Sequence, residues 1–239
     1  MARNVPVALL AGGGILLVGA LMSATRGHAA DRGFSVGPFD RIQSSVPYNV
    51  RVHTGPAASV HAEGSKEALD RLVVEVAGGE LVIRNSTRTW WGGWNWHHEK
   101  VTIDVTTPML TAAKLSGPGD LAIDRITGPS FTAVQNGPGN LLIRQADVGD
   151  ISLSLSGPGD VKVLGRATTA HLSVRGPGDL RARDLTVRDA TVDLSGPGDI
   201  SVTATATATG TLRGPGDNVV HGGARCSISK SGPGDVTCA

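Results

Sequence analysis

Apolar and polar residues alternate with a period of two along most of the chain after residue 110. Ile151, Leu153 and Leu155 are apolar with serines between them, and Leu121 and Ile123 flank an alanine. Alternation of this kind predicts β-strands that bury one face. The same pattern recurs at Leu141 and Ile143, Val161 and Val163, Leu172 and Val174, Val192 and Leu194, and Ile200 and Val202.

A tetrapeptide separates these predicted strands at nearly constant spacing. It reads Gly-Pro-Gly-Asp, except that Asn140 replaces Asp in the second copy, and successive copies are 20, 20, 19, 20, 18 and 18 residues apart. The seven copies start at Gly117, Gly137, Gly157, Gly176, Gly196, Gly214 and Gly232. Proline fixes its φ and glycine admits φ > 0, so the tetrapeptide predicts a turn. One period is therefore expected to contain a strand, a turn, a second strand and a looser connection.

A unit of about 20 residues cannot cover its own apolar face, so successive units are expected to stack. Stacking would place Leu121, Leu141 and Val161 in one internal ladder, where each buried aliphatic side chain contributes roughly 1.5–3 kcal/mol. A sandwich of hairpins is the competing fold, but it needs no fixed corner tetrapeptide. The sequence thus predicts an all-β protein with a parallel β-helix or solenoid over residues 111–239.

Residues 34–110 lack the tetrapeptide and form a less regular β-rich part. Strand-like runs cover residues 48–52, 59–62, 72–76, 80–84 and 101–105. Ser65 is a candidate N-cap for one or two helical turns over residues 65–72. Gly78 and Gly79 predict a hairpin turn. This part is expected to be either the entry coils of the solenoid or a capping module that protects its end.

The chain resembles a known bacterial family at several of these places. The stretch 39–42, the strands at 48–52 and 79–83, the segment 101–108 and the repeated tetrapeptide together resemble the auto-transporter adhesin head domain, called the GIN domain. Family members usually carry Gly-Ser-Gly-Asp, and here Pro stands in the Ser place. The resemblance extends over about residues 34–239. It implies a right-handed, pectate-lyase-like stacked β fold, export and an adhesive role, and it carries over no catalytic or binding residue.

Residues 1–30 have the pattern of a secretory signal peptide. Arg3 precedes an uncharged apolar stretch at residues 5–22, and small residues before Ala30 suit a cleavage site after Ala29 or Ala30. The alternative is an uncleaved membrane anchor, because the stretch is just long enough to span a bilayer. Both interpretations place the rest of the chain outside the cytoplasm, in the periplasm, on the cell surface or secreted.

The charge balance and the motifs of the chain make several classes of function unsuitable. Lys plus Arg number 22 and Asp plus Glu 21, which gives no basic stripe for a nucleic-acid partner. The sequence contains no His-Glu-x-x-His, Gly-x-Ser-x-Gly or phosphate-binding loop, so we expect a non-enzymatic protein without cofactor or metal. The leading hypothesis is an adhesion or binding module for a glycan, a cell-envelope component or a protein. A purely structural envelope protein and a polysaccharide-active enzyme are the alternatives.

The last residue of each corner forms a row along the predicted stack: Asp120, Asn140, Asp160, Asp179, Asp199, Asp217 and Asp235. We expect these carboxylates to be structural, each accepting backbone N–H bonds in its own turn, a role that an asparagine also fills. Arg175 and Arg213 are expected to pair with them. Calcium binding is the alternative, although the nine-residue repeat of calcium-binding β-rolls is missing.

The four tryptophans lie in one short segment between two predicted strands: Trp90, Trp91, Trp94 and Trp96. Exposed aromatic residues beside Asn and His are typical of carbohydrate-stacking or interfacial surfaces. This segment is therefore the candidate binding site. The alternative is that the rings fold back and plug the end of the solenoid.

Cys226 and Cys238 lie six residues before and six residues after Gly232, so both fall on the inward-pointing side of their strands. An oxidising compartment permits a disulfide between them. The bridge would pin the terminal coil and contribute roughly 2–3 kcal/mol. Two buried thiols are the alternative.

Overall fold

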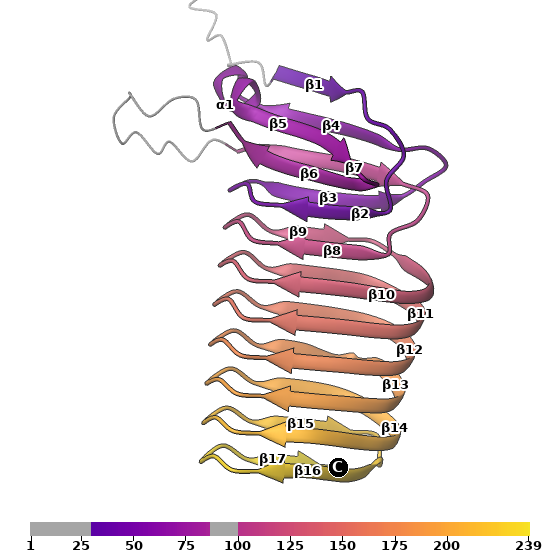
Figure 1. Cartoon of the computed structure of the whole chain (residues 1–239), viewed down its shortest axis with the longest axis vertical. Coiled ribbons are helices and arrows are strands. Elements are labelled where there is room, and N and C mark those ends of the chain that lie inside the picture. Colours follow the sequence, from indigo (N-terminus) through magenta and orange to yellow (C-terminus); the bar gives the residue numbers. More distant parts are fainter. Residues whose placement is uncertain (1–29, 87–99) are drawn as a thin grey trace, which may run out of the picture.

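The computed structural model describes residues 30–86 and 100–239. Strands contain 64% of the described residues and helix 3%, and the strands wind into a parallel β-solenoid of about six turns. Figure 1 shows the result as a long column of stacked coils with a different arrangement at its N-terminal end. The predicted fold class is confirmed.

The regular coils contain ten strands: β8 (Ala112–Leu115), β9 (Leu121–Ile123), β10 (Ile126–Gln135), β11 (Leu141–Leu155), β12 (Val161–Val174), β13 (Leu180–Leu194), β14 (Ile200–Leu212), β15 (Asn218–His221), β16 (Arg225–Lys230) and β17 (Val236–Cys238). The tetrapeptides lie between them, on one edge of the column. The looser connection expected in each period is absent from β11 to β13, where one strand continues around both faces. The bend is absorbed by register shifts between neighbouring coils, such as the one between Ile143 and Ala146.

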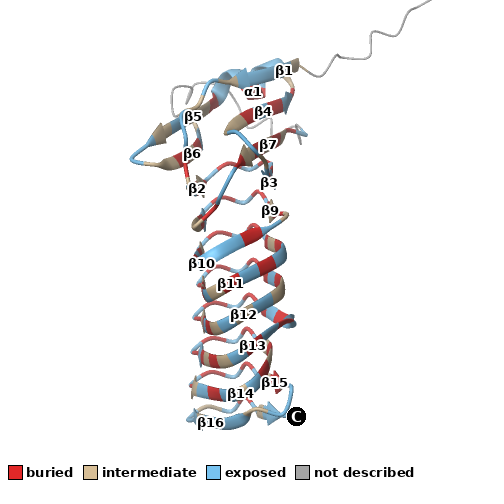
Figure 2. Ribbon diagram, turned by 90° about the vertical axis from the view of Figure 1, so that its right-hand side faces the viewer, coloured by how far each residue is buried: buried red, intermediate tan, exposed pale blue. Residues whose placement is uncertain are grey.

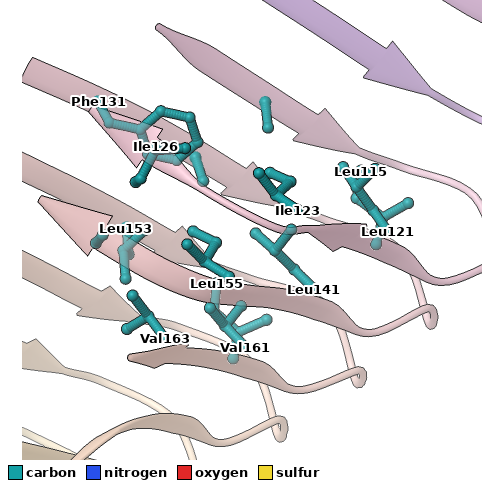
Figure 3. Close-up of a cluster of buried hydrophobic side chains, with 14 of the residues drawn as sticks. Leu115, Leu121, Ile123, Ile126, Phe131, Leu141, Leu153, Leu155, Val161 and Val163 are labelled. Atoms are coloured by element: carbon teal, nitrogen blue, oxygen red, sulfur yellow. The ribbon is translucent and has the colours of Figure 1, made fainter. Parts of the chain in front are cut away.

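The predicted internal ladder is present. Leu141 pairs in register with Leu121 on one side and Val161 on the other, and all three are 2% exposed or less. Figure 2 shows buried residues repeating from coil to coil, and Figure 3 shows these side chains stacked between the strands. Each coil thus completes the core of its neighbours, which is why no single unit is stable alone.

The corner glycines are needed for a reason other than the one expected. A Cβ on Gly159 would lie 2.1 Å from the Gly139 oxygen, and one on Gly119 would lie 2.0 Å from the Tyr48 oxygen. Positive φ angles among the described glycines occur at Gly78, Gly79, Gly128, Gly165, Gly210, Gly222 and Gly223, none of which belongs to a corner. The expectation that corner glycines supply φ > 0 is therefore wrong. They lack a side chain because the next coil leaves no room for one.

The first coils do not follow the order of the sequence. They consist of β2 (Arg41–Ser44), β3 (Asn49–Thr54), β6 (Glu80–Asn85) and β7 (Thr102–Thr107). Strand β2 pairs with both β6 and β8, and β3 pairs with both β7 and β9. The β2–β3 coil therefore lies between two coils that come later in the chain. Its corner consists of residues 46–49, which lie in register with the first tetrapeptide and have Pro47 in the proline position.

The N-terminal end is covered by antiparallel strands and one short helix. These are β1 (Ala30–Phe34), β4 (Ser59–Gly64), α1 (Lys66–Arg71) and β5 (Leu72–Ala77). Strand β4 pairs with β7, β1 with β4, and β5 with β6. The Ser65 Oγ accepts from the Ala68 N–H at 3.2 Å, and Gly78 and Gly79 turn the β5–β6 hairpin, so both local predictions are confirmed.

Residues 34–110 thus supply both entry coils and a cap. Across residues 30–86 and 100–239, no helix is long and apolar enough to cross a membrane.

Candidate functional site

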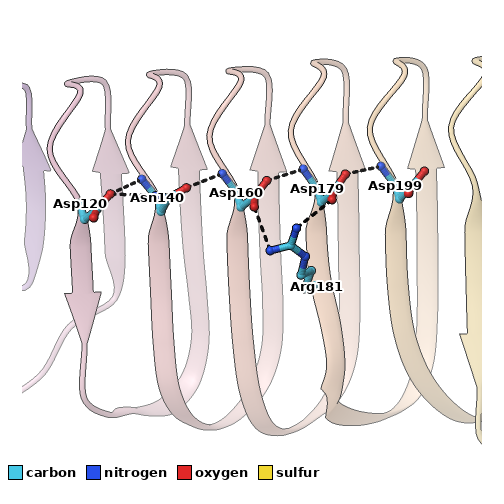
Figure 4. Close-up of polar contacts among 6 residues, drawn as sticks. All are labelled: Asp120, Asn140, Asp160, Asp179, Arg181 and Asp199. Atoms are coloured by element: carbon cyan, nitrogen blue, oxygen red, sulfur yellow. Dashed lines mark hydrogen bonds and ion pairs between the residues drawn. The ribbon is translucent and has the colours of Figure 1, made fainter.

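The Asp/Asn row forms a continuous hydrogen-bonded ladder along the corner edge (Figure 4). The Asp120 Oδ1 accepts from the Asn140 backbone N–H at 2.8 Å, and the Asn140 Oδ1 accepts from the Asp160 N–H at 3.0 Å. The same bond repeats down the row to Asp179, Asp199, Asp217 and Asp235 at 2.7–3.0 Å. The predicted bonding within each turn is wrong. The backbone N–H of each Asp or Asn in the row points along the stack, so each side-chain oxygen accepts from the next coil.

Two basic side chains compensate part of this negative row. The Arg181 guanidinium lies 2.9 Å from the Asp160 Oδ2 and 3.0 Å from the Asp179 Oδ2, and Lys230 binds the Asp235 Oδ1 at 2.9 Å. Asp179 directly precedes β13 and Arg181 follows it by two residues in extended backbone, so their shared face was readable from the sequence.

The expected pairing of the row with Arg175 and Arg213 is wrong, because both arginines precede the corner while the carboxylates stand at its last residue. Neither arginine forms an ion pair with a described residue.

Asp199 and Asp217 have no cationic partner among the described residues. In water, two charges one coil apart repel each other by roughly 1 kcal/mol. The backbone hydrogen bonds that these carboxylates accept contribute a similar amount of free energy, and they therefore keep the row intact. Each Oδ1 atom points towards the next coil, so the carboxylates do not converge on one point where an ion could bind. In the described part of the chain, no group of three or more His, Cys, Asp or Glu side chains is arranged to hold a metal ion.

The predicted tryptophan site, Trp90, Trp91, Trp94 and Trp96, lies outside the described residues. The strands on either side of it are described. Ile83 on β6 pairs with Ser44, and Thr102 on β7 pairs with Asn49. Strand β6 therefore ends, and strand β7 begins, on the edge of the column where the corners of the other coils lie.

Cys226 on β16 and Cys238 on β17 are joined in a disulfide, with their Cα atoms 6.6 Å apart. They continue the inward rows of Ala208 and Val220, but both are exposed because no further coil covers them. Lys230 takes an inward position in the same coil, beneath Leu212. The disulfide and the charged side chain at an inward position both discourage the pairing of a further strand with this edge of the sheet.

The face before each corner carries polar side chains that bond from coil to coil. The Thr207 hydroxyl donates to the Asp189 carboxylate at 2.6 Å, and the Thr211 hydroxyl donates to Asp193 at 2.7 Å. At the bend, Arg166 holds Asp147 at 2.8 Å, and this hydrogen bond lowers the pKa of the Asp147 carboxyl. The column thus presents hydroxyl, carboxylate and guanidinium groups in fixed rows about 4.8 Å apart.

Comparison with known proteins agrees with this architecture. The family model described as "Putative auto-transporter adhesin, head GIN domain" matches residues 38–224. No curated protein sequence matches the chain.

Three crystal structures share the fold. A putative adhesin from Bacteroides fragilis NCTC 9343 has a TM-score of 0.82 and 24% identity, covering 89% of this chain and 98% of its own. A putative adhesin from Parabacteroides distasonis ATCC 8503 has a TM-score of 0.70 and 19% identity, covering 90% and 98%. A putative lipid binding protein from the same strain has a TM-score of 0.69 and 21% identity, covering 90% and 98%. At sequence identities this low, the three matches show a common fold and do not identify a ligand for this chain.

Proposed function

Since the chain belongs to the family described as putative auto-transporter adhesin, head GIN domain, we propose that it is an exported, non-enzymatic binding module of the bacterial envelope that attaches to glycan. The observation that carries this proposal is the register of the outward side chains. A rigid column presents its outward side chains in fixed register from coil to coil, with the Asp/Asn row as the repeated group, and a polysaccharide presents its hydroxyl groups in fixed register from unit to unit. Preorganised polar groups lose little conformational entropy on binding.

Two further features support export. Residues 1–30 have the signal-peptide pattern, and the Cys226–Cys238 disulfide suits an oxidising compartment. The mature chain would then start near residue 31.

The tryptophan segment is the proposed main contact. The strands that flank it, β6 and β7, end and begin on the corner edge at the N-terminal end of the column. Residues 90–96 contain all four tryptophans of the chain, and indole rings are of the type that stacks on sugars. Met109 is the exposed large apolar residue of the described part, at 48% exposure.

A glycan array and a pull-down with purified cell walls test the proposal. We expect the wild-type chain to bind, Trp94→Ala and Trp96→Ala to lose at least tenfold in affinity, and Met109→Ala to bind like the wild type. Binding unchanged in both tryptophan variants would remove the segment from the site.

A wild-type chain that retains nothing from the array or the cell walls would favour a purely structural envelope protein, for which the coil-spanning ladder and the stapled end are sufficient. Release of sugar that Asp160→Asn abolishes would favour a polysaccharide-active enzyme.

A further inference from the structure

The face after the corner carries one shallow hollow of about 270 Å³, where β3, β9 and β11 lie side by side. Arg51, Ala122 and Leu142 are neighbours in one outward row across these strands. Ala122 lies between two long side chains in this row. Because the alanine side chain is much shorter than its neighbours, it leaves the hollow between them. The volume is just below the 300–1,000 Å³ typical of sites for drug-sized ligands, so it suits a single ring.

Arg51 supplies an uncommitted positive charge at this place. It is exposed, and no described residue pairs with it, because Asp104 beside it in register lies 3.6 Å from His53 instead. The other two cations of the row are engaged: Lys162 lies 3.9 Å from Asp184, and Arg181 bridges two carboxylates of the corner row.

The upper rim of the hollow offers hydrogen-bonding groups. Asp120 lines it, and its Oδ1 accepts from the Asn140 backbone N–H at 2.8 Å and from the Asn140 side chain at 3.0 Å. The Asp120 Oδ2 has no partner among the described residues. Asn49, next to Asp120 in register, also lines the hollow, and its amide is likewise uncommitted there.

We propose that this hollow binds one carboxylated sugar unit, such as a uronic acid, an assignment that rests on the proposed glycan-binding function. The Arg51 guanidinium holds the sugar carboxylate in a bidentate pair, which is the geometry that arginine favours. Asp120 and Asn49 hydrogen-bond the ring hydroxyls. Ala122 and Leu142 form an apolar floor for the C–H face of the ring.

The surroundings limit the ligand to a short or terminal acidic unit. The corner row continues below the hollow, and Asp199 and Asp217 have no cationic partner among the described residues. A long polyanion lying along the column would meet these carboxylates and be repelled, whereas a single acidic unit at Arg51 would not. The positive charge of Arg51 attracts an acidic ligand to the hollow, and the carboxylates farther along the column limit the length of that ligand.

Titration of the ¹⁵N-labelled chain with glucuronate, followed by NMR, tests the assignment, with glucose as the neutral probe. We expect glucuronate to shift the amides of Val50, Arg51 and Ala122, and glucose at equal concentration to leave them in place. Arg51→Gln should weaken glucuronate binding at least tenfold, and Ala122→Leu should abolish it by filling the hollow.

The controls are matched in chemistry and distant in the column. Arg183→Gln removes an exposed charge on β13, and Ser201→Leu adds the same bulk to the same outward row on β14. Both should bind glucuronate like the wild type.

Equal shifts with glucose, or wild-type affinity in Arg51→Gln, overturns the acidic-sugar site. If glycans bind through residues 87–99 and leave Arg51 untouched, the site is wrong while the proposed function stands. If the chain binds no glycan anywhere, both are wrong.

Discussion

Replacing Gly159 with alanine tests the stacking that underlies the whole column. The added Cβ would lie 2.1 Å from the Gly139 oxygen, 2.6 Å from the Gln135 Nε2 and 2.8 Å from the Gly139 carbonyl carbon. Two of these three atoms belong to the backbone of the neighbouring coil, which is held in place by its own ladder bonds. The collision therefore has to be relieved by moving coils apart, not by turning a side chain.

The expected magnitude follows from two opposing effects. Overpacking of a rigid site costs about 1–3 kcal/mol, and a backbone obstacle places this site at the upper end. A glycine-to-alanine change also reduces the entropy of the unfolded chain and returns about 0.4–1 kcal/mol. We expect Gly159→Ala to lower the free energy of unfolding by about 2 kcal/mol. Gly37→Ala is the matched control, because a Cβ there meets nothing within 4 Å.

Urea unfolding followed by far-ultraviolet circular dichroism measures the difference, provided that the slope of the free energy against urea is the same in both variants. Gly37→Ala should be as stable as the wild type or slightly more stable. If Gly159→Ala unfolds within about 0.5 kcal/mol of Gly37→Ala, the coils are not packed as closely as the structure shows, and the steric account of the repeat fails.

Three further predictions concern the row, the bend and the staple. Asp199→Ala should lower the free energy of unfolding by about 1 kcal/mol in urea titrations, and Asp199→Asn should restore it, because an amide oxygen still accepts the Asp217 N–H. The Asp147 carboxyl, whose pKa Arg166 lowers, should titrate below the usual Asp range in NMR and return to it in Arg166→Gln; its contribution to stability is present at neutral pH and is lost as pH falls through the lowered pKa. Reducing the Cys226–Cys238 disulfide should lower the stability of the last coil by roughly 3 kcal/mol, because the bridge then no longer restricts the unfolded chain. Hydrogen exchange should become faster in β16 and β17 but not in β11.

The sequence predicted the regular part of the fold well because one signal was repeated. Period-two alternation and the tetrapeptide together located the ladder of Leu121, Leu141 and Val161, and the Ser65 cap and the Gly78–Gly79 turn were recognised from local chemistry alone. Each of these signals acts between residues that are close in the chain or equivalent in the repeat.

The order of the first coils could not be predicted in this way. The segment that returns from β7 to β8 passes the start of β2, where the Thr107 hydroxyl donates to the Phe39 oxygen at 2.9 Å and the Thr111 hydroxyl donates to the Asp40 oxygen at 3.0 Å. Two isolated threonines carry no periodic signal. Pro47, between a valine and a tyrosine, was the one available hint that a corner already exists before the first glycine copy.

The candidate site was only partly predictable for a related reason. A repeat gives the identity of the corner carboxylates but not the partner of each one, which depends on the direction of the N–H groups in the folded stack. Arg181 follows Asp179 by two residues and pairs with it, so this partner could have been found from the spacing. The hollow beside Arg51 could not, because Ala122 becomes its floor only when β3 and β9, which are far apart in the chain, lie next to each other.

Close stacking also explains where binding chemistry can arise in such a column. Within the regular coils, each inward position is fixed by the core and each corner glycine by the coil above, so only outward side chains and departures from the repeat are free to vary. The two most evident departures are the Arg51–Ala122 hollow and the lack of a Gly-Pro-Gly-Asp tetrapeptide in the sequence between β6 and β7, and both belong to the N-terminal coils. The opposite end is stapled by Cys226 and Cys238 and carries the inward Lys230. A module built this way is expected to bind its ligand near the N-terminal coils, and the remaining coils then act as a rigid stalk.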